Sequence, residues 1–265
     1  MKKKMIEFEE LMNMKNYHTH TMRCYHALDK EEDYILAAIK TGYKELGFSD
    51  HTPWRYESNF HSAIRMEEDK LEGYVKTLSE LREKYKDQIS IKIGLECEYY
   101  PKYIDWLKGV IEEYQLDYII LGNHFDETDE TGIYFGRPLT KEQLRKYVDI
   151  TIEGLKTGLY SYLAHPDLAN YPMDDPYYTQ EMTRLCLAAK ELDIPLEYNL
   201  LGYEEHRQYP NETFFKIASQ VGNKVIIGVD AHESRSLLNV DLYNQAHDFL
   251  QSLGLEFAKE IKFFR

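Results

Sequence analysis

Short apolar runs alternate with longer segments of helical period along most of the chain. The strand-like runs are residues 15–18, 45–49, 89–96, 118–122, 161–165, 195–198 and 224–229. The helix-like segments are residues 30–41, 66–85, 103–114, 141–156, 180–192, 211–221 and 241–250, where apolar residues recur every three or four positions. Seven strand–helix repeats predict a parallel α/β fold, and 265 residues suit a barrel of seven or eight such units.

An open, doubly wound sheet is the alternative arrangement of such repeats. Its usual glycine fingerprints, GxGxxG and GxxxxGKS/T, are absent from the sequence. No Ser/Gly-rich linker or low-complexity tract divides the chain either. We therefore expect residues 1–265 to form one domain with a barrel-like fold.

Charge and cysteine content limit the partners and the compartment. A net charge of −14 and a pI of about 5.2 disfavour nucleic acid and anionic membranes, which require a basic surface. A small anionic substrate remains compatible if metal ions or a few arginines reverse the field locally. Three cysteines without CxxC spacing argue against a disulfide framework and against a thiolate zinc site. The charged N-terminal MKKKMIEFEELM does not resemble a signal peptide, so we expect a cytoplasmic protein; its oligomeric state stays open.

Most of the histidines fall at or just beyond the ends of predicted strands, together with one glutamate and one aspartate. These nine residues are His18, His20, His26, His51, Glu96, His124, His165, Asp230 and His232. In a barrel the carboxyl ends of the strands meet on one face, and residues i and i+2 of a strand point to the same side. Nine imidazole and carboxylate ligands exceed the needs of one ion, so we expect two or three divalent ions, with Zn, Fe or Mn as candidates.

The bland interpretation is that each histidine is an ordinary core or surface residue, and an isolated HxH pair is weak evidence by itself. Nine polar groups gathered at strand ends would cost on the order of several kcal/mol if nothing compensated them. A metal cluster explains why the fold tolerates them. The other histidines lack this placement: His247 lies within a predicted helix, and His61 and His206 lie in loops.

The motifs HTH, His26, SDH, GLE, GNH, AHP and VDAH, in this order, resemble those of the PHP (polymerase and histidinol phosphatase) superfamily. The segments HTHTMRCYHA, FSDHTPW, IKIGLECEYY and GVDAH are most similar to its histidinol-phosphatase branch. The resemblance spans residues 18–232 and implies a distorted, TIM-like (β/α)7 barrel with a trinuclear metal centre. It also implies hydrolysis of L-histidinol phosphate to L-histidinol and phosphate, a step of histidine biosynthesis.

Carried over to this chain, the resemblance implies three ligand sets. The first is His18, His20, Glu96 and Asp230; the second is Glu96, His124 and His165, with Glu96 as the bridge; the third is His26, His51 and His232. Glu96 and Asp230 are thereby expected to be catalytic, with a metal-bridging hydroxide as the nucleophile. Arg207 maps, more loosely, to an arginine that binds the substrate phosphate, and Arg23, Arg137 and Arg235 are alternatives by position.

Other roles remain open at this stage. A different small phosphoester such as a nucleotide, a metal-dependent amide hydrolysis and a non-enzymatic metal-binding module are the rival functions. Cys24 and Cys97 are interpreted as packing residues. Asp50 and Asn123 are candidates to orient the imidazoles beside them, and Glu98 is one of several candidates to bind the substrate ammonium.

Overall fold

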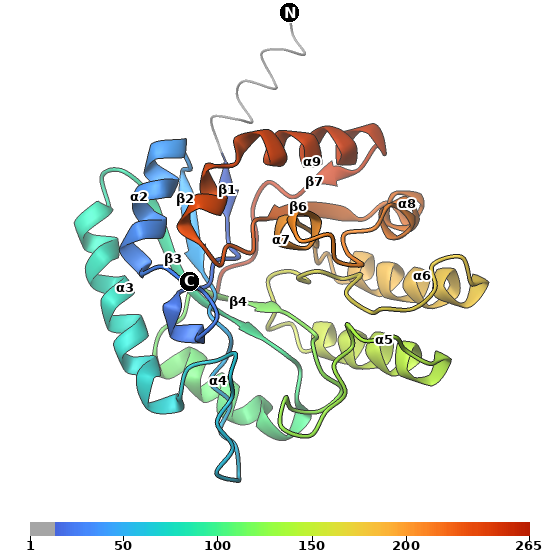
Figure 1. Cartoon of the computed structure of the whole chain (residues 1–265), viewed down its shortest axis with the longest axis horizontal. Helices are drawn as coiled ribbons and strands as arrows, with labels where there is room; N and C mark the ends of the chain where they lie inside the picture. Colours follow the sequence, from blue (N-terminus) through green and yellow to red (C-terminus); the bar gives the residue numbers. More distant parts are fainter. Residues whose placement is uncertain (1–13) are drawn as a thin grey trace, which may run out of the picture. The chain divides into compact units, whose positions relative to one another are not determined.

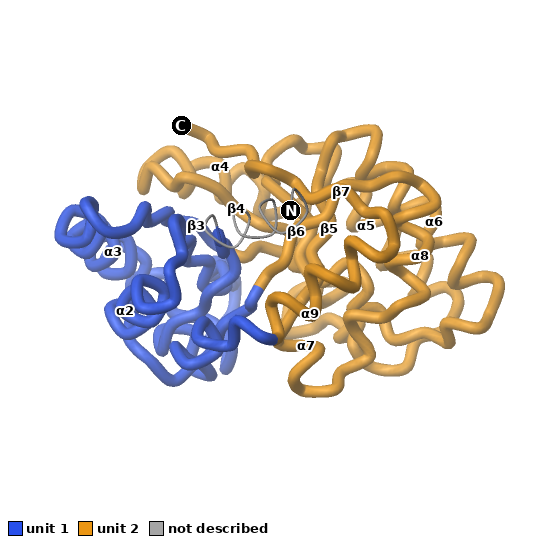
Figure 2. The backbone as a smooth tube through the Cα atoms, turned by 90° about the horizontal axis from the view of Figure 1, so that it is seen from above, with its two compact units in different colours: residues 1–95, 229–241 blue, residues 96–228, 242–265 orange. Residues whose placement is uncertain are grey.

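The computed structural model describes residues 14–265, and the N-terminal segment judged above for signal-peptide character lies outside them. The chain divides into two compact units (Figure 2). Unit 1 comprises residues 1–95 and 229–241, and unit 2 comprises residues 96–228 and 242–265. None of the helices within residues 14–265 combines the length and the apolar character that crossing a bilayer requires.

Unit 1 holds the first parallel strands and the helices packed beside them. The strands are β1 (Lys15–Asn16), β2 (Glu45–Phe48) and most of β3 (Ser90–Cys97). The central strand β2 pairs in parallel with both neighbours, so that Glu45 lies opposite Lys15 on one side and opposite Ser90 on the other. The helical elements are η1 (Met22–Cys24), α2 (Glu31–Thr41), η2 (Glu68–Lys70), α3 (Leu71–Tyr85) and η4 (Ser234–Leu238). Figure 1 shows α2 and α3 side by side.

Local sequence signals account for α2. Three acidic residues occupy its first turn, where negative charge is favourable near the helix N-terminus. Tyr34, Ile35 and Ala38 form its buried face with the three- and four-residue spacing of a helix. Gly42 ends the helix in the left-handed conformation, at φ 95°, which glycine adopts without steric cost.

Unit 2 holds β4 (Tyr118–Leu121), β5 (Leu196–Asn199), β6 (Lys224–Gly228) and β7 (Glu256–Phe257). The last three form a parallel sheet in the order β5-β6-β7. Strand β4 follows the end of β3, where the Gly122 N–H donates to the Cys97 carbonyl oxygen at 3.1 Å, which gives the first sheet the order β1-β2-β3-β4. The helical elements are η3 (Pro101–Tyr103), α4 (Ile104–Glu113), α5 (Lys141–Lys156), α6 (Pro176–Glu191), α7 (Leu200–Glu204), α8 (Glu212–Val221) and most of α9 (Val240–Ser252).

Helices α5, α6 and α8 lie side by side (Figure 1) and cover the strands of unit 2. A capping box begins α5, since Thr140 Oγ1 accepts from the Gln143 N–H at 3.3 Å. Asp175 caps α6 and Pro176 occupies its first turn, where the missing N–H of proline costs nothing. These caps fix where each crossover helix begins.

The predicted parallel α/β fold is confirmed, with differences in detail. Predicted strand 161–165 is reduced to single parallel bridges from Leu163 to Leu121 and to Leu196, because His165 turns away at φ 29° before Pro166. Helix α6 begins four residues before the predicted position because its cap is Asp175. The short elements α7 and β7 were not predicted, since five-residue and two-residue stretches carry too little periodicity.

Candidate metal centre

Six of the nine predicted ligands lie together in unit 1. We call them the imidazole cluster; its members are His18, His20, His26, His51, Asp230 and His232. Ring centroids of His20 and His232 are 4.4 Å apart and those of His20 and His51 are 4.5 Å apart. His18 and His20 are fully buried, and their Nε2 atoms face each other at 3.1 Å.

Backbone pairing between two distant segments builds this cluster. The Ala231 N–H donates to the His18 carbonyl oxygen at 3.1 Å, and the His20 N–H donates to the Ala231 carbonyl oxygen at 2.9 Å. Buried Asn16 ties the same segments together, because its Oδ1 accepts from the Val229 N–H at 2.9 Å. The HTH and DAH motifs therefore lie in adjacent strand-like segments, and their alternate residues project to one side.

Asp230 is held in an unusual conformation at the centre of the imidazole cluster. Its φ of 52° lies in the left-handed region, which costs a non-glycine residue free energy and is concentrated at functional sites. Its Oδ1 lies 3.3 Å from the Nε2 atoms of both His18 and His20. Burial alone would raise the pKa of Asp230, but His18, His20 and His232 outweigh it and hold the pKa well below its usual value. The group is therefore a carboxylate at neutral pH.

The hydrogen bonds of two histidines show that the cluster suits a cation. His26 Nδ1 lies 2.7 Å from the Cys24 carbonyl oxygen, and His232 Nδ1 lies 3.0 Å from the Asp230 carbonyl oxygen. A carbonyl oxygen only accepts, so both Nδ1 atoms carry a proton, and in the neutral imidazoles both Nε2 atoms carry a lone pair. Those two Nε2 atoms face each other at 2.9 Å. Metal bonds of about 2.1 Å at a tetrahedral angle would place them about 3.4 Å apart, so a small opening of this pair would accommodate an ion between the two nitrogens.

The electrostatics of the cluster favour neutral imidazole at His232. Burial, followed by the nearby His20, lowers the pKa of His232 to about 3. A neutral ring with its lone pair on Nε2 is the form that binds a metal ion. The ligand nitrogens of His26, His51 and His232 lie within 4.8 Å of one another, which is the third ligand set implied by the family resemblance.

Asp50 supports the turn after the HTH motif. Its two carboxylate oxygens accept from the N–H and the hydroxyl of Thr21, both at 2.6 Å. Its Oδ1 lies 3.9 Å from His20 Nδ1, beyond hydrogen-bond distance. Burial raises the pKa of Asp50 to about 8. Asp50 was a candidate to orient the adjacent His51. Its hydrogen bonds go to Thr21 instead.

The other three predicted ligands lie together in unit 2. We call Glu96, Glu98, His124 and His165 the glutamate cluster. Glu96 Oε1 lies 2.8 Å from His165 Nε2 and 3.3 Å from His124 Nε2, and all three side chains are nearly inaccessible to solvent. Gly122 makes room for this carboxylate, because a Cβ at that position would lie 2.0 Å from Glu96 Oε1. One oxygen facing two imidazoles is the donor set expected of a metal-bridging glutamate.

Glu98 fixes the orientation of His124. Its Oε1 lies 3.0 Å from His124 Nδ1, so His124 carries its proton there and presents a lone pair from Nε2 toward Glu96. Glu98 is 1% exposed, and the contact with His124 gives it a role at this cluster besides the suggested one of binding the substrate ammonium. The sequence did contain the signal, since Glu98 lies two residues after Glu96 and alternation places both on the same side of the extended chain.

Glu98→Gln is expected to weaken metal binding and activity by about 10- to 100-fold, as for other carboxylates that orient a metal-ligating histidine. The amide can still accept from His124 Nδ1 through its oxygen, but it loses the negative charge that makes the imidazole a stronger ligand. Metal content after dialysis and the rate of phosphate release measure the effect. Unchanged values for both would show that Glu98 only fills space.

The remaining predicted residues lie apart from the two clusters or serve other contacts. Asn123 donates to the Tyr147 carbonyl oxygen at 3.2 Å and to Thr151 Oγ1 at 2.7 Å, so it anchors the chain to α5 and does not orient His124. His61 is exposed and pairs with Glu67. His247 lies in α9 as predicted; its ring stacks on that of Phe257, with centroids 4.5 Å apart, and is partly exposed.

Arg207 lies in the loop after α7, in unit 2. Its guanidinium contacts Glu205 at 2.5 Å, and its Nη1 donates to the Tyr209 hydroxyl at 2.7 Å. The buried Tyr209 ring lies 5.6 Å from the His165 ring, so Arg207 is connected to the glutamate cluster through one aromatic side chain. Sequence analysis missed Tyr209 because nothing in its local pattern distinguishes it from the other 22 tyrosines.

Comparison with known proteins identifies the family of the chain. The "Probable histidinol-phosphatase" of Deinococcus radiodurans is 25% identical over 228 residues, covering 82% of this chain and 85% of that protein. The "Histidinol-phosphatase" of Bacillus subtilis is 24% identical over 254 residues, covering 84% and 95%. The crystal structure of histidinol phosphate phosphatase from Lactococcus lactis, complexed with Zn, L-histidinol and phosphate, has the same fold, with a TM-score of 0.73 at 17% identity over 95% of this chain and 98% of that one. The PHP domain model matches residues 16–200, which confirms the resemblance drawn from the motifs: the chain belongs to the PHP domain family.

Proposed function

We propose that this protein is a metal-dependent phosphomonoesterase that hydrolyses L-histidinol phosphate to L-histidinol and phosphate. The observation that carries the proposal is the facing pair of Nε2 atoms on His26 and His232 within a complete set of expected ligands. The histidinol-phosphatase names of the relatives from Deinococcus radiodurans and Bacillus subtilis support the substrate. The Lactococcus lactis protein supports the same chemistry, since its structure contains Zn, L-histidinol and phosphate.

The proposal assigns both clusters to one centre of two or three divalent ions, with Zn, Fe or Mn as candidates. The assigned ligands are His18, His20, His26, His51, Glu96, His124, His165, Asp230 and His232. Connectivity supports a single centre in a single domain. Glu96 directly follows the last residue that β3 contributes to unit 1, and Asp230 comes two residues after β6. We also propose that the strands close into a distorted seven-stranded barrel, because the segment continuing β6 runs parallel to the segment continuing β1.

The chemistry divides between the ions and the protein. Divalent ions held at the site would supply Lewis acidity toward the phosphoryl oxygens and would lower the pKa of water near them. Asp230 enters as a carboxylate, because its pKa is held well below the usual value. His232 enters as a neutral imidazole, because burial lowers its pKa to about 3. These residues would hold the cations where the phosphate dianion must bind, and the cations would locally reverse the field of a chain with net charge −14.

Arg207 is proposed to bind the substrate phosphate by exchanging its contact with Glu205 for the phosphoryl oxygens. A guanidinium offers two parallel N–H donors to a phosphate, which a lysine ammonium does not. Arg23 is a weaker candidate, because its guanidinium already contacts Glu31 and Thr77 Oγ1. Arg235 is likewise paired with Glu233.

Arg207→Ala is expected to raise KM for the phosphate monoester by about 10- to 100-fold, the loss of about 1.5–3 kcal/mol from hydrogen bonds to a charged group. Arg207→Lys should recover only part of this loss because the bidentate contact is not restored. Steady-state kinetics separate KM from kcat, and metal content should stay at the wild-type level in both variants. An unchanged KM would assign the phosphate to another residue.

A phosphate-release assay on metal-replete protein tests the substrate. L-histidinol phosphate should give the highest kcat/KM against a panel of nucleoside monophosphates, sugar phosphates and p-nitrophenyl phosphate. A clear preference for a nucleotide would replace the substrate with the alternative, a PHP-type phosphoesterase of nucleotides or other small phosphoesters. No release from any member of the panel, with metal content verified, would overturn the enzymatic function itself.

A further inference from the structure

Cys24 lies in the turn η1, between the HTH motif and His26, with no exposed surface. It contacts the imidazole cluster in two ways. Its backbone carbonyl oxygen accepts from His26 Nδ1 at 2.7 Å. Its Sγ lies within 4.8 Å of a ring nitrogen of His20 and 3.1 Å from the Thr21 carbonyl oxygen. A residue interpreted from the sequence as packing is therefore in contact with two of the proposed ligands.

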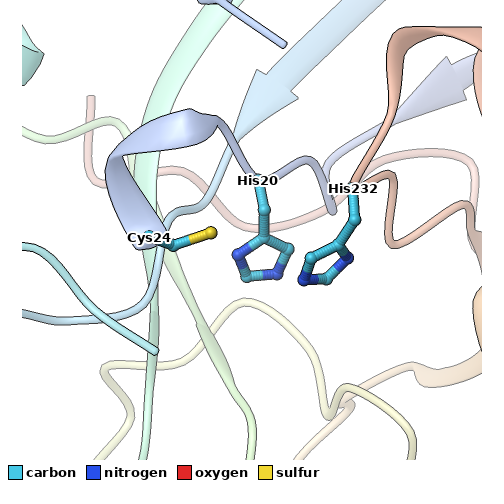
Figure 3. Close-up of side chains that lie close together, drawn as sticks. All are labelled: His20, Cys24 and His232. Atoms are coloured by element: carbon cyan, nitrogen blue, oxygen red, sulfur yellow. The ribbon is translucent and has the colours of Figure 1, made fainter. Parts of the chain in front are cut away.

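Figure 3 shows how the sulfur approaches His20. The Cys24 sulfur points toward one nitrogen of the His20 ring, and His232 lies on the opposite side of that ring. The nitrogen of His20 that faces the cluster is Nε2, at 3.1 Å from His18 Nε2 and 3.3 Å from Asp230 Oδ1. The sulfur therefore faces the other nitrogen, Nδ1. The nearest carboxylate, Asp50, does not accept from this nitrogen, because its Oδ1 is 3.9 Å from His20 Nδ1.

The ligand atoms of His20, Cys24 and His232 all lie within 4.8 Å of one another, so the sulfur has two possible roles. It could bind an ion directly, or it could accept a hydrogen bond from the His20 ring nitrogen that points away from the ion. The thiol has a donor and an acceptor function, and its donor side is aimed at the Thr21 carbonyl oxygen. The remaining lone pairs of the sulfur are then available to an N–H of His20, and the approach from the Nδ1 side favours the second role.

We propose that Cys24 is a positioning residue whose sulfur accepts the Nδ1–H of His20 and so keeps the His20 Nε2 lone pair directed at a metal ion. The inference rests on the proposed metal centre and adds a residue to it. Hydrogen bonds to the far nitrogen of a ligating histidine fix its tautomer and ring orientation. Carboxylates and carbonyl oxygens usually play this part, as Glu98 does for His124 and the Cys24 carbonyl oxygen does for His26. Cys24 thereby positions two ligands, one with its backbone and one with its side chain.

The tautomer of His20 is the direct test. In the zinc-loaded protein labelled with ¹⁵N-histidine, two-dimensional ¹H–¹⁵N spectra should show His20 with its proton on Nδ1 and in slow exchange with water. The resonance is assigned by its loss in His20→Gln. A proton on Nε2, with zinc bound through Nδ1, would overturn the proposal without any cysteine variant.

Variants test the energetic consequence. Cys24→Ala should weaken zinc retention against a competing chelator by about 10- to 100-fold, and Cys24→Ser, whose hydroxyl can accept the same proton, should recover most of it. The matched control is Cys186→Ala, another fully buried thiol, which is expected to retain zinc like the wild type. Wild-type retention in Cys24→Ala, or equal losses in the alanine and serine variants, would sink the positioning role.

Cobalt substitution separates positioning from direct ligation. The Co(II) protein should show no thiolate-to-cobalt charge-transfer absorption in the near ultraviolet. Such a band, present in the wild type and absent from Cys24→Ser, would make the sulfur a ligand and overturn the proposal. If the wild-type protein retains neither zinc nor cobalt, the proposed metal centre fails instead, so the two failures are distinguishable.

Discussion

Glu96→Gln should abolish phosphatase activity and release bound metal, more completely than any other isosteric change in the chain. Its Oε1 faces His165 Nε2 at 2.8 Å and His124 Nε2 at 3.3 Å in a fully buried position, and we assign it as the bridge between two ions. The amide keeps the shape of the side chain but removes the negative charge that would bind the cations. A loss larger than the 10- to 100-fold expected for an orienting carboxylate is therefore predicted. Metal content per chain and the rate of phosphate release measure it.

Glu181→Gln is the matched control for this change. Glu181 is also a fully buried glutamate, but it lies in α6, outside both clusters, and is paired with Arg184. Its substitution should lower the free energy of unfolding while leaving the metal content unchanged. Activity in Glu96→Gln within a few-fold of the wild type, at full metal occupancy, would remove the bridging role.

The fold class followed from the sequence because alternation between strand and helix periods is strong where elements are long. Helices α3 and α5 end where the apolar spacing ends, at Tyr85 and Lys156. The segment around Leu163 was expected to be a strand, yet only Leu163 itself is bridged to its neighbours. The run of residues 161–165 does not reveal that His165 will take a positive φ, because its N–H donates to Glu197 Oε2 at 2.9 Å, a residue far along the chain.

The site divides in the same way between residues that sequence reasoning could reach and residues that it could not. The proposed ligands were identifiable because most of them lie at or just after the end of a predicted strand, and spacing alone places His18 and His20 on one side. The groups that support them could not be recognised from the sequence. Cys24 contacts His26 through its own backbone carbonyl oxygen, and Asn16 accepts from the N–H of Val229, which is far away in the sequence. Asn123 was expected to orient His124 because it is its neighbour, but its side chain points to α5. Adjacency in sequence predicts a contact poorly when successive side chains of an extended chain point to opposite sides.

Gly122→Ala is expected to be nearly as damaging as the loss of Glu96, although it adds only a methyl group. The new Cβ would lie 2.0 Å from Glu96 Oε1 and 2.6 Å from its Cδ, closer than any atoms tolerate. The carboxylate cannot swing aside without leaving His165 and His124. Overpacking of this kind costs about 1–3 kcal/mol of stability, and here the strain falls on a proposed ligand. Urea unfolding, metal content and phosphate release should all decline.

Two further glycines separate the ligand effect from the packing effect. Gly109→Ala, in α4, meets no atom within 4 Å and should leave metal binding and activity unchanged while raising stability by about 0.5–1 kcal/mol. Gly228→Ala would place its Cβ 1.8 Å from Oε1 of Glu197, a buried glutamate that we do not assign as a ligand. Glu197 Oε2 accepts from the His165 N–H at 2.9 Å, so Gly228→Ala reaches one proposed ligand only through its backbone. It should therefore lower stability as much as Gly122→Ala does, but retain more metal. If Gly122→Ala and Gly228→Ala lose stability and metal in the same proportion, the harm comes from packing alone, and the space that Gly122 leaves for Glu96 has no special part in holding the ions.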